Sequence, residues 1–361
     1  MTDHGYLMTK PTPVFAQPTQ LKALQHYCDY VYVDPQRSDQ NIHLRLTQGQ
    51  PLSRALTQPQ LNGAPHALSK LREVLRNMST LVNHTIREAR QNGQIELKPI
   101  YSELDTFLDS TLENTDGMQW LIATEPVKGF LSRRALGTSM LCIVFGRQLG
   151  LERHELLQLA LGGLLLDIGK VSVPITILAK PERLNAEEKW FTTRHVQQSL
   201  AMMHFNGENL DRVVPMIAAH HERLDGSGYP NQITGTNIPL YARIAGIVDT
   251  FDALTLNRRY APARSGYSAL RFLSALRQTK FDAALVDEFI LSLGIYPIGT
   301  RVQLDDGSTG LVLGQNSGQP RQPNVLLTHD TAGQPVKTIR IVTIGLTTPI
   351  TQTFPTAGQK E

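Results

Sequence analysis

The spacing of apolar residues between positions 62 and 291 most constrains how this chain can fold. Within 62–92, apolar side chains recur every three or four residues, the period of an amphipathic helix that ends near Gly93. Similar patterns predict helices at 100–114, 127–149, 152–166, 186–205, 210–222, 240–257, 267–279 and 282–292. The sequence therefore predicts a mainly α-helical protein.

The two ends of the chain have a different character. Before the first helix, "YVYVD" at 30–34 alternates like a strand that ends at Pro35. After residue 299, "TRVQLDDGSTGLVLGQN" has the pattern of two strands joined by an Asp-Gly turn. We therefore expect a small N-terminal α+β domain that ends in helices, a helical core, a small β module and a flexible tail, at 1–120, 125–292, 295–350 and 351–361 respectively.

Composition excludes several classes of protein. The net charge of +3 over 361 residues is too small for a nucleic-acid-binding footprint. No apolar stretch is long enough to span a membrane, and the N-terminus lacks the pattern of a signal peptide. The two cysteines, Cys28 and Cys142, lie far apart and fit free thiols in a reducing compartment. We therefore expect a cytoplasmic protein without nucleic-acid partners.

Acid and imidazole side chains gather in the helical region. Asp167 follows an apolar run in "LLLDIGK" (164–170), and the other members lie in or beside separate predicted helices: His195, His220, His221, Glu222, Asp249 and Asp252. Imidazole and carboxylate ligands from several helices suit iron, manganese, zinc or nickel. A hydroxide held between two such metals attacks phosphodiesters. Simpler alternatives stay open, because Asp167 could pair locally with Lys170 and a single buried histidine is often only structural.

Four stretches resemble one family. "HHERLDGSGYP" (220–230) is similar to the signature HHExxDGxGYP of the HD-GYP phosphodiesterases, a branch of the HD superfamily. The other three stretches follow the family's order and spacing: "DIGKVSVP" (167–174), "KPERLNAEEKWFTTRH" (180–195) and "RIAGIVDTFDALT" (243–255). The resemblance covers about 125–291, and the flanking segments resemble an N-terminal domain of unknown function and a β module of some members. The resemblance implies a helical HD fold. It also implies an enzyme that uses two or three metals to hydrolyse cyclic di-GMP to pGpG or GMP.

The resemblance also implies roles for individual residues. Asp167 matches the bridging aspartate, Asp249 an acid on the second metal, and Lys170 the lysine that meets substrate phosphate. The remaining ligands of the first metal match His195, His220 and His221. The candidate catalytic residues are thus Lys170 and Asp167, and the candidate phosphate contacts are Lys170, Arg243 and Arg258. Arg243 could equally be ordinary surface charge.

The loop after the paired histidines matches the family's GYP loop, which is implicated in contacts with diguanylate cyclase (GGDEF) domains. Its matching residues are Asp225, Gly226, Gly228, Tyr229 and Pro230. Cyclic di-GMP, GGDEF proteins and a second copy of the chain are therefore the partners that we consider.

Two family ligands are missing. Leu166 stands at the histidine of the HD pair, and Arg134 stands at the histidine one helix earlier. Both belong to the same metal in the family, so that metal keeps only Asp167 and Asp249. The Arg134 guanidinium would repel a cation there, or would pair with both carboxylates in its place. We therefore expect at most one divalent transition metal and no second site.

Three functions remain open at this point. We expect a degenerate HD-GYP protein with lost or much weakened phosphodiesterase activity, acting as a cyclic di-GMP receptor or a protein-interaction module. One alternative is an active metal-dependent phosphodiesterase. The other is a structural scaffold in which the same residues form buried ion pairs.

Overall fold

The computed structural model describes residues 64–203, 210–257, 262–316, 322–338, 340–345 and 349–356. The chain divides into two units, Met1–Leu56 and Thr57–Glu361, and all described residues belong to the second unit. The predicted strand at 30–34, most of the predicted N-terminal domain, Cys28 and Arg258 lie outside the described residues.

The described chain is mainly helical, as predicted. Its α-helices are α4 (Ala64–Asn92), α5 (Lys98–Glu113), α6 (Thr115–Thr124), α7 (Phe130–Gln148), α8 (Arg153–Leu165), α9 (Ile175–Leu178), α10 (Ala186–Thr193), α11 (His195–Met202), α12 (Val213–Ala219), α13 (Leu240–Thr255), α14 (Gly266–Leu276) and α15 (Ala283–Leu293). Two short 3-10 helices are η1 (Ile168–Ser172) and η2 (Gly235–Asn237). Helix α6 was not predicted, and the single helix expected at 186–205 is two helices, α10 and α11, that meet at Arg194.

One hydrophobic core joins most of these helices. It includes Leu71 of α4, Phe107 of α5, Phe145 of α7 and Phe289 of α15. The domain boundary expected near 120–125 therefore does not separate two cores. The reason is that α4 and α5 bury their apolar faces against α7 and α8.

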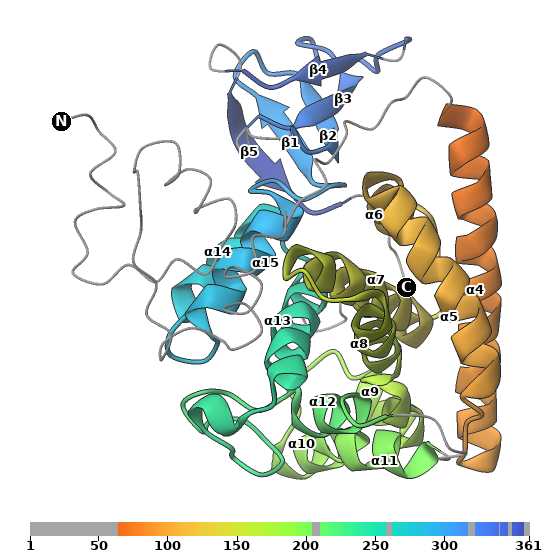
Figure 1. Cartoon of the computed structure of the whole chain (residues 1–361). Coiled ribbons are helices and arrows are strands. Elements are labelled where there is room, and N and C mark those ends of the chain that lie inside the picture. Colours follow the sequence, from red (N-terminus) through yellow and green to blue (C-terminus); the bar gives the residue numbers. More distant parts are fainter. Residues whose placement is uncertain are drawn as a thin grey trace, which may run out of the picture. The chain divides into compact units, whose positions relative to one another are not determined.

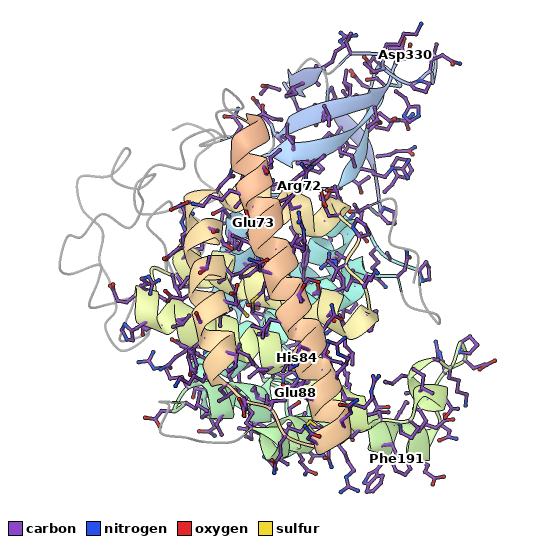
Figure 2. All side chains as sticks on the ribbon, turned by 90° about the vertical axis from the view of Figure 1, so that its right-hand side faces the viewer. Arg72, Glu73, His84, Glu88, Phe191 and Asp330 are labelled. Carbon is purple, nitrogen blue, oxygen red and sulfur yellow. The ribbon has the colours of Figure 1, made fainter. Side chains whose placement is uncertain are left out.

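Helix α4 is the longest helix among the described residues and runs beside α5 and α6 (Figure 1). Met78 and Val82 bury its inner face. Its outer face is polar, and Figure 2 labels His84 and Glu88 there, whose side chains form an i,i+4 ion pair at 3.2 Å. Exposed ion pairs of this kind contribute little stability, so the apolar face holds α4 in place.

Five antiparallel strands follow the helices. They are β1 (Arg301–Leu304), β2 (Thr309–Gly314), β3 (Asn324–His329), β4 (Ile341–Thr343) and β5 (Ile350–Phe354), in the order β4-β3-β2-β1-β5. The predicted hairpin is present as β1 and β2, which join at a turn where Gly307 has a positive φ of 87°. The prediction of a flexible tail from residue 351 is wrong for residues 351–354. These residues belong to β5, which pairs with the edge of β1. Val302, Val312 and Val325 form the small core of the sheet, and Trp120 of α6 packs against it.

No helix among the described residues is both long and apolar enough to cross a bilayer.

One buried carboxyl in the helical core should make stability depend on pH. Glu288 of α15 is 3% exposed, and burial raises its pKa to about 8, although it accepts a 2.9 Å hydrogen bond from Gln148. Between the ordinary carboxyl pKa near 4.5 and about 8, the folded state binds more protons than the unfolded state. The free energy of unfolding should therefore fall as the pH rises through this window.

The substitution Glu288→Gln should flatten this pH dependence, because an amide stays neutral throughout. Urea unfolding at pH 5, 7 and 8.5 would measure it, with the exposed Glu96→Gln as the matched control. A slope that persists unchanged in Glu288→Gln would contradict the assignment.

Candidate metal centre

Asp167 is held in place by the turn that joins α8 to η1. A Cβ on Gly169 would lie 2.2 Å from the His195 carbonyl oxygen and 2.4 Å from the Ser199 nitrogen, so only glycine allows this approach. The Ser199 hydroxyl accepts a hydrogen bond from the Gly169 nitrogen at 2.9 Å and donates one to the Leu166 carbonyl at 3.1 Å. These contacts fix Asp167 beside the first residue of α11, His195.

The paired histidines follow α12, and the backbone packs closely around them. A Cβ on Gly246 of α13 would lie 2.8 Å from the His220 carbonyl oxygen. The His221 ring stacks on Tyr229, with centroids 4.5 Å apart and planes inclined by 25°. The GYP loop therefore folds back on the histidine pair that precedes it.

Glu222, the next residue, holds this loop in place. One of its carboxylate oxygens accepts a hydrogen bond from the Asn231 nitrogen at 2.7 Å, and the other accepts one from the Ile233 nitrogen at 3.1 Å. A Cβ on Gly228 would lie only 2.4 Å from the Glu222 Cα. Glu222 and Gly228 of the motif therefore determine the position of the loop.

Four side chains converge on one point. Asp167, His195, His220 and His221 each offer one ligand atom, and these atoms all lie within 4.8 Å of one another. His195 Nε2 lies 3.3 Å from Asp167 Oδ1 and 3.2 Å from His221 Nε2. Four of the residues predicted as metal ligands are therefore brought together.

Backbone carbonyls determine which ring nitrogens face this point. The Nδ1 atom of His195 donates to the Thr192 oxygen at 2.6 Å, and that of His220 donates to the Ile217 oxygen at 2.8 Å. The Nε2 atom of each ring then carries a lone pair. Burial lowers the pKa of His195 to about 4, with Lys170 adding to the effect, and burial also lowers the pKa of His220 and His221. At pH 7 all three rings are neutral, the state that a metal ligand requires.

These residues fit a divalent metal. Asp167 Oδ1 and His220 Nε2 are buried and have no hydrogen-bond partner among the described residues, although buried polar atoms nearly always have one. The 3.2 Å between the Nε2 atoms of His195 and His221 is close to the separation of about 3.3 Å that two nitrogen ligands have around a tetrahedral zinc. A cation among the four ligand atoms would satisfy all of them.

Beside this set lies a second cluster, centred on Arg134. Its side chain comes from α7 and is 2% exposed. It donates to Asp167 Oδ2 at 3.0 Å and to Asp249, and its Nη1 atom lies 3.1 Å from Asp252 Oδ2. Burial alone would lower the pKa of Arg134, but the three carboxylates raise it above its ordinary value. The ion pairs considered for Arg134 from the sequence are present, with Asp252 as an additional partner.

Lys170 shares an acceptor with Arg134. Its ammonium lies 2.7 Å from Asp167 Oδ2, the oxygen to which Arg134 also donates. Burial alone would raise the pKa of Asp167, but Lys170, Arg134 and His195 hold it well below its ordinary value. Asp167 therefore has one oxygen paired with two cations, and its other oxygen faces the histidines.

The remaining predicted site residues are placed as follows. Asp249 contacts Arg134, and its Oδ2 lies 3.9 Å from His221 Nδ1. Leu166 is 1% exposed and belongs to the hydrophobic core. Arg243 pairs with Asp282 at 2.6 Å and donates to the Ile238 oxygen, so it serves the packing of α13 rather than the centre.

The tip of the GYP loop is exposed. Asp225 accepts hydrogen bonds from the Ser227 nitrogen and hydroxyl, and Lys280 lies 3.5 Å from its carboxylate. Gly226 has a positive φ of 74°, and Pro230 is exposed. The loop thus presents polar groups outward while Tyr229 contacts the histidines.

Two roles were not predicted from the sequence. Asp252 lies three residues after Asp249 in α13, a spacing that places both carboxylates on one helix face and signals a shared partner. Glu222 adjoins the histidine pair, so its position suggests a ligand, yet it holds backbone groups of the loop.

Comparison with known proteins agrees with this geometry. The HD domain family matches residues 118–285. The cyclic di-GMP phosphodiesterase PA4108 of Pseudomonas aeruginosa is 31% identical over 239 residues, which cover 66% of this chain and 58% of that protein. The cyclic di-GMP phosphodiesterase response regulator RpfG of Xanthomonas campestris is 38% identical over 144 residues, 40% of this chain and 38% of that protein. The 3'3'-cGAMP-specific phosphodiesterase 2 of Vibrio cholerae is 39% identical over 132 residues, 34% of this chain and 25% of that protein.

Residues 118–285 thus match an HD domain, which agrees with the helical core described above. The resemblance to HD-GYP proteins inferred from the sequence is confirmed. The chain spans less than two thirds of the length of each of these three relatives.

Removal of Arg134 should destabilise the fold. The substitution Arg134→Ala would leave three buried carboxylates without their shared cation, which should cost about 3–5 kcal/mol in the free energy of unfolding. Added Mg²⁺ or Mn²⁺ should raise the melting temperature of this variant more than that of the wild type. Differential scanning fluorimetry with and without metal would measure both effects.

The matched control is Arg153→Ala, which removes half-exposed ion pairs to Asp105 and Asp109. It should lose about 1 kcal/mol or less. Equal stability of the two variants would contradict a structural role for the Arg134 cluster.

Proposed function

We propose that this protein is a degenerate HD-GYP protein of cyclic di-GMP signalling. Its phosphodiesterase activity is lost or much weakened, and it acts as a ligand receptor or a protein-interaction module. The observation that carries the proposal is the Arg134 guanidinium, which pairs with Asp167, Asp249 and Asp252 in the part of the centre where the family resemblance implies a second metal.

The oxygens of Asp167 support a single metal. A carboxylate that bridges two metals with one oxygen on each needs both oxygens, but Oδ2 is already engaged by Arg134 and Lys170. Oδ1 remains, together with three neutral imidazoles. This ligand set suits one iron, manganese, zinc or nickel ion.

Charge points the same way. Three carboxylates, Asp167, Asp249 and Asp252, are matched by three cationic side chains, Arg133, Arg134 and Lys170. A second divalent cation about 4 Å from the buried guanidinium would meet a repulsion of about 8 kcal/mol at an effective dielectric constant near 20. The cluster thus favours the guanidinium over a second metal.

The chain's own residues support binding better than hydrolysis. A metal, when bound, supplies Lewis acidity and an activated water, but one ion cannot clamp both the attacking and the leaving oxygen. Lys170 is 16% exposed and could turn its ammonium from Asp167 to a phosphodiester oxygen. A cyclic dinucleotide could therefore bind without efficient cleavage.

An active phosphodiesterase is the alternative. The convergent ligand set and Lys170 favour it, and relatives are named as phosphodiesterases of cyclic di-GMP or 3'3'-cGAMP. The exposed tip of the GYP loop is the surface that we propose for GGDEF partners. A cytoplasmic location and a homodimer stay predictions.

The number of bound metals tests the proposal directly. Protein purified after separate loading with manganese, iron, zinc or nickel should hold about one tightly bound ion per chain, measured by elemental analysis. The substitution His220→Ala should abolish tight binding, since His220 contributes one of only four ligand atoms. Two or more tightly held ions per chain in the wild type would contradict the proposal.

Restoring the missing ligands should restore the chemistry. The double substitution Arg134→His with Leu166→His should raise the metal content towards two ions and raise the rate of cyclic di-GMP hydrolysis by at least tenfold over the wild type. Each single substitution is the control and should stay near the wild-type rate. Wild-type turnover already equal to that of intact family members would instead establish the alternative.

Titration of the wild type with cyclic di-GMP separates the receptor from the scaffold. Saturable binding below about 100 μM, weakened at least fivefold by Lys170→Met, supports the receptor. If no binding occurs in that range, only protein partners remain.

A further inference from the structure

A cavity lies where the helical core meets the segments that enter and leave the β-sheet. It contains about 740 Å³ of empty space, part of which is open to solvent. Helices α6, α7 and α13 form one side, and residues just before β1 and after β5 form the other. The apolar part of its wall includes Ile122, Met140, Leu141, Phe251 and Ile298. An apolar wall of this kind is typical of small-molecule sites.

Polar side chains meet in this cavity from separate elements. Arg133 of α7 is half-buried, while Asp252 of α13 and Thr300 are buried. Arg264 lies at the exposed edge, with its guanidinium 5.1 Å from the Phe272 ring centroid. Polar groups that converge beside an apolar surface fix the orientation of a bound molecule.

Gly137 of α7 leaves room for the side chains of Arg133 and Asp252. A Cβ at this position would lie 2.6 Å from both Arg133 Nη1 and Asp252 Oδ1. The other oxygen of Asp252 lies 3.1 Å from Arg134 Nη1. One carboxylate therefore faces two guanidinium groups, one on the side of the cavity and one on the side of the metal centre.

Charged side chains contribute to the wall of the cavity. Among the residues that the structure describes, they are Arg133, Arg264 and Asp252, and Asp252 also lies 3.1 Å from Arg134. Burial lowers the pKa of Arg133, and Asp252 only partly offsets this effect. An added negative charge would stabilise the buried guanidinium.

We propose that this cavity binds a small organic anion with a ring-sized apolar body, whose charged group lies between Arg133 and Arg264. The β-sheet module then has a function, because the segments that flank it close one side of the site. Asp252 connects the bound anion to Arg134, so occupancy of the cavity biases the ion pairs of the metal centre. The site does not depend on the proposed binding of cyclic di-GMP.

Phenyl phosphate is a suitable probe, tested on the full-length chain freed of metal with a chelator. We expect a saturable rise in melting temperature of about 2–4 °C. The rise should be lost in Arg133→Gln and in Arg264→Gln. It should persist in Arg153→Gln, which alters exposed ion pairs on α8, and in Lys170→Met, which alters the metal centre.

Each other outcome would overturn the proposal. No saturable rise in the wild type, or a rise kept in both cavity variants, means that the cavity does not bind the anion. A rise lost in Lys170→Met but kept in Arg264→Gln places the anion at the metal centre. An equal rise with inorganic phosphate means that the apolar wall takes no part. Arg264→Gln alters an exposed residue, so it carries the test if Arg133→Gln does not fold.

Discussion

The ion pairs of Arg134 are the interaction on which the centre of this fold depends. Backbone packing alone brings three carboxylates together, because the turn after α8 supplies Asp167 and one face of α13 supplies Asp249 and Asp252. Such a cluster needs a cation to be stable when buried. A metal would meet that need and also exchange ligands, whereas a guanidinium meets it with a fixed charge and no Lewis acidity. In this chain the requirement of the fold can therefore be met without the chemistry of the family.

The sequence predicted the helical core well because burial follows its local periodicity. It did not predict α6, a ten-residue helix whose close approach to α4 places the Gly117 Cβ position 2.8 Å from Leu71. Strand β5 was also not predicted. Its stability comes from pairing with β1, about fifty residues away, and no local pattern reports that contact.

In the candidate centre, too, local sequence predicts some features and long-range packing determines the others. Asp167, His195, His220 and His221 lie in motifs of recognisable spacing, and the structure brings them together. Arg243 also lies in such a motif, yet it pairs with Asp282, thirty-nine residues away, because both lie where α13 meets the start of α15. Motif spacing thus identifies which residue types are available. The long-range packing decides which of them face the centre.

The two cations at Asp167 Oδ2 differ in a way that bears on metal binding. Lys170 comes from the same turn as Asp167 and is 16% exposed, so its ammonium can leave the centre by side-chain rotation alone. Arg134 comes from α7, is 2% exposed and donates to both Asp167 and Asp249, so it cannot leave without breaking the core. Of the two cations at Oδ2, Lys170 can therefore move away without disturbing the core, whereas Arg134 is part of that core.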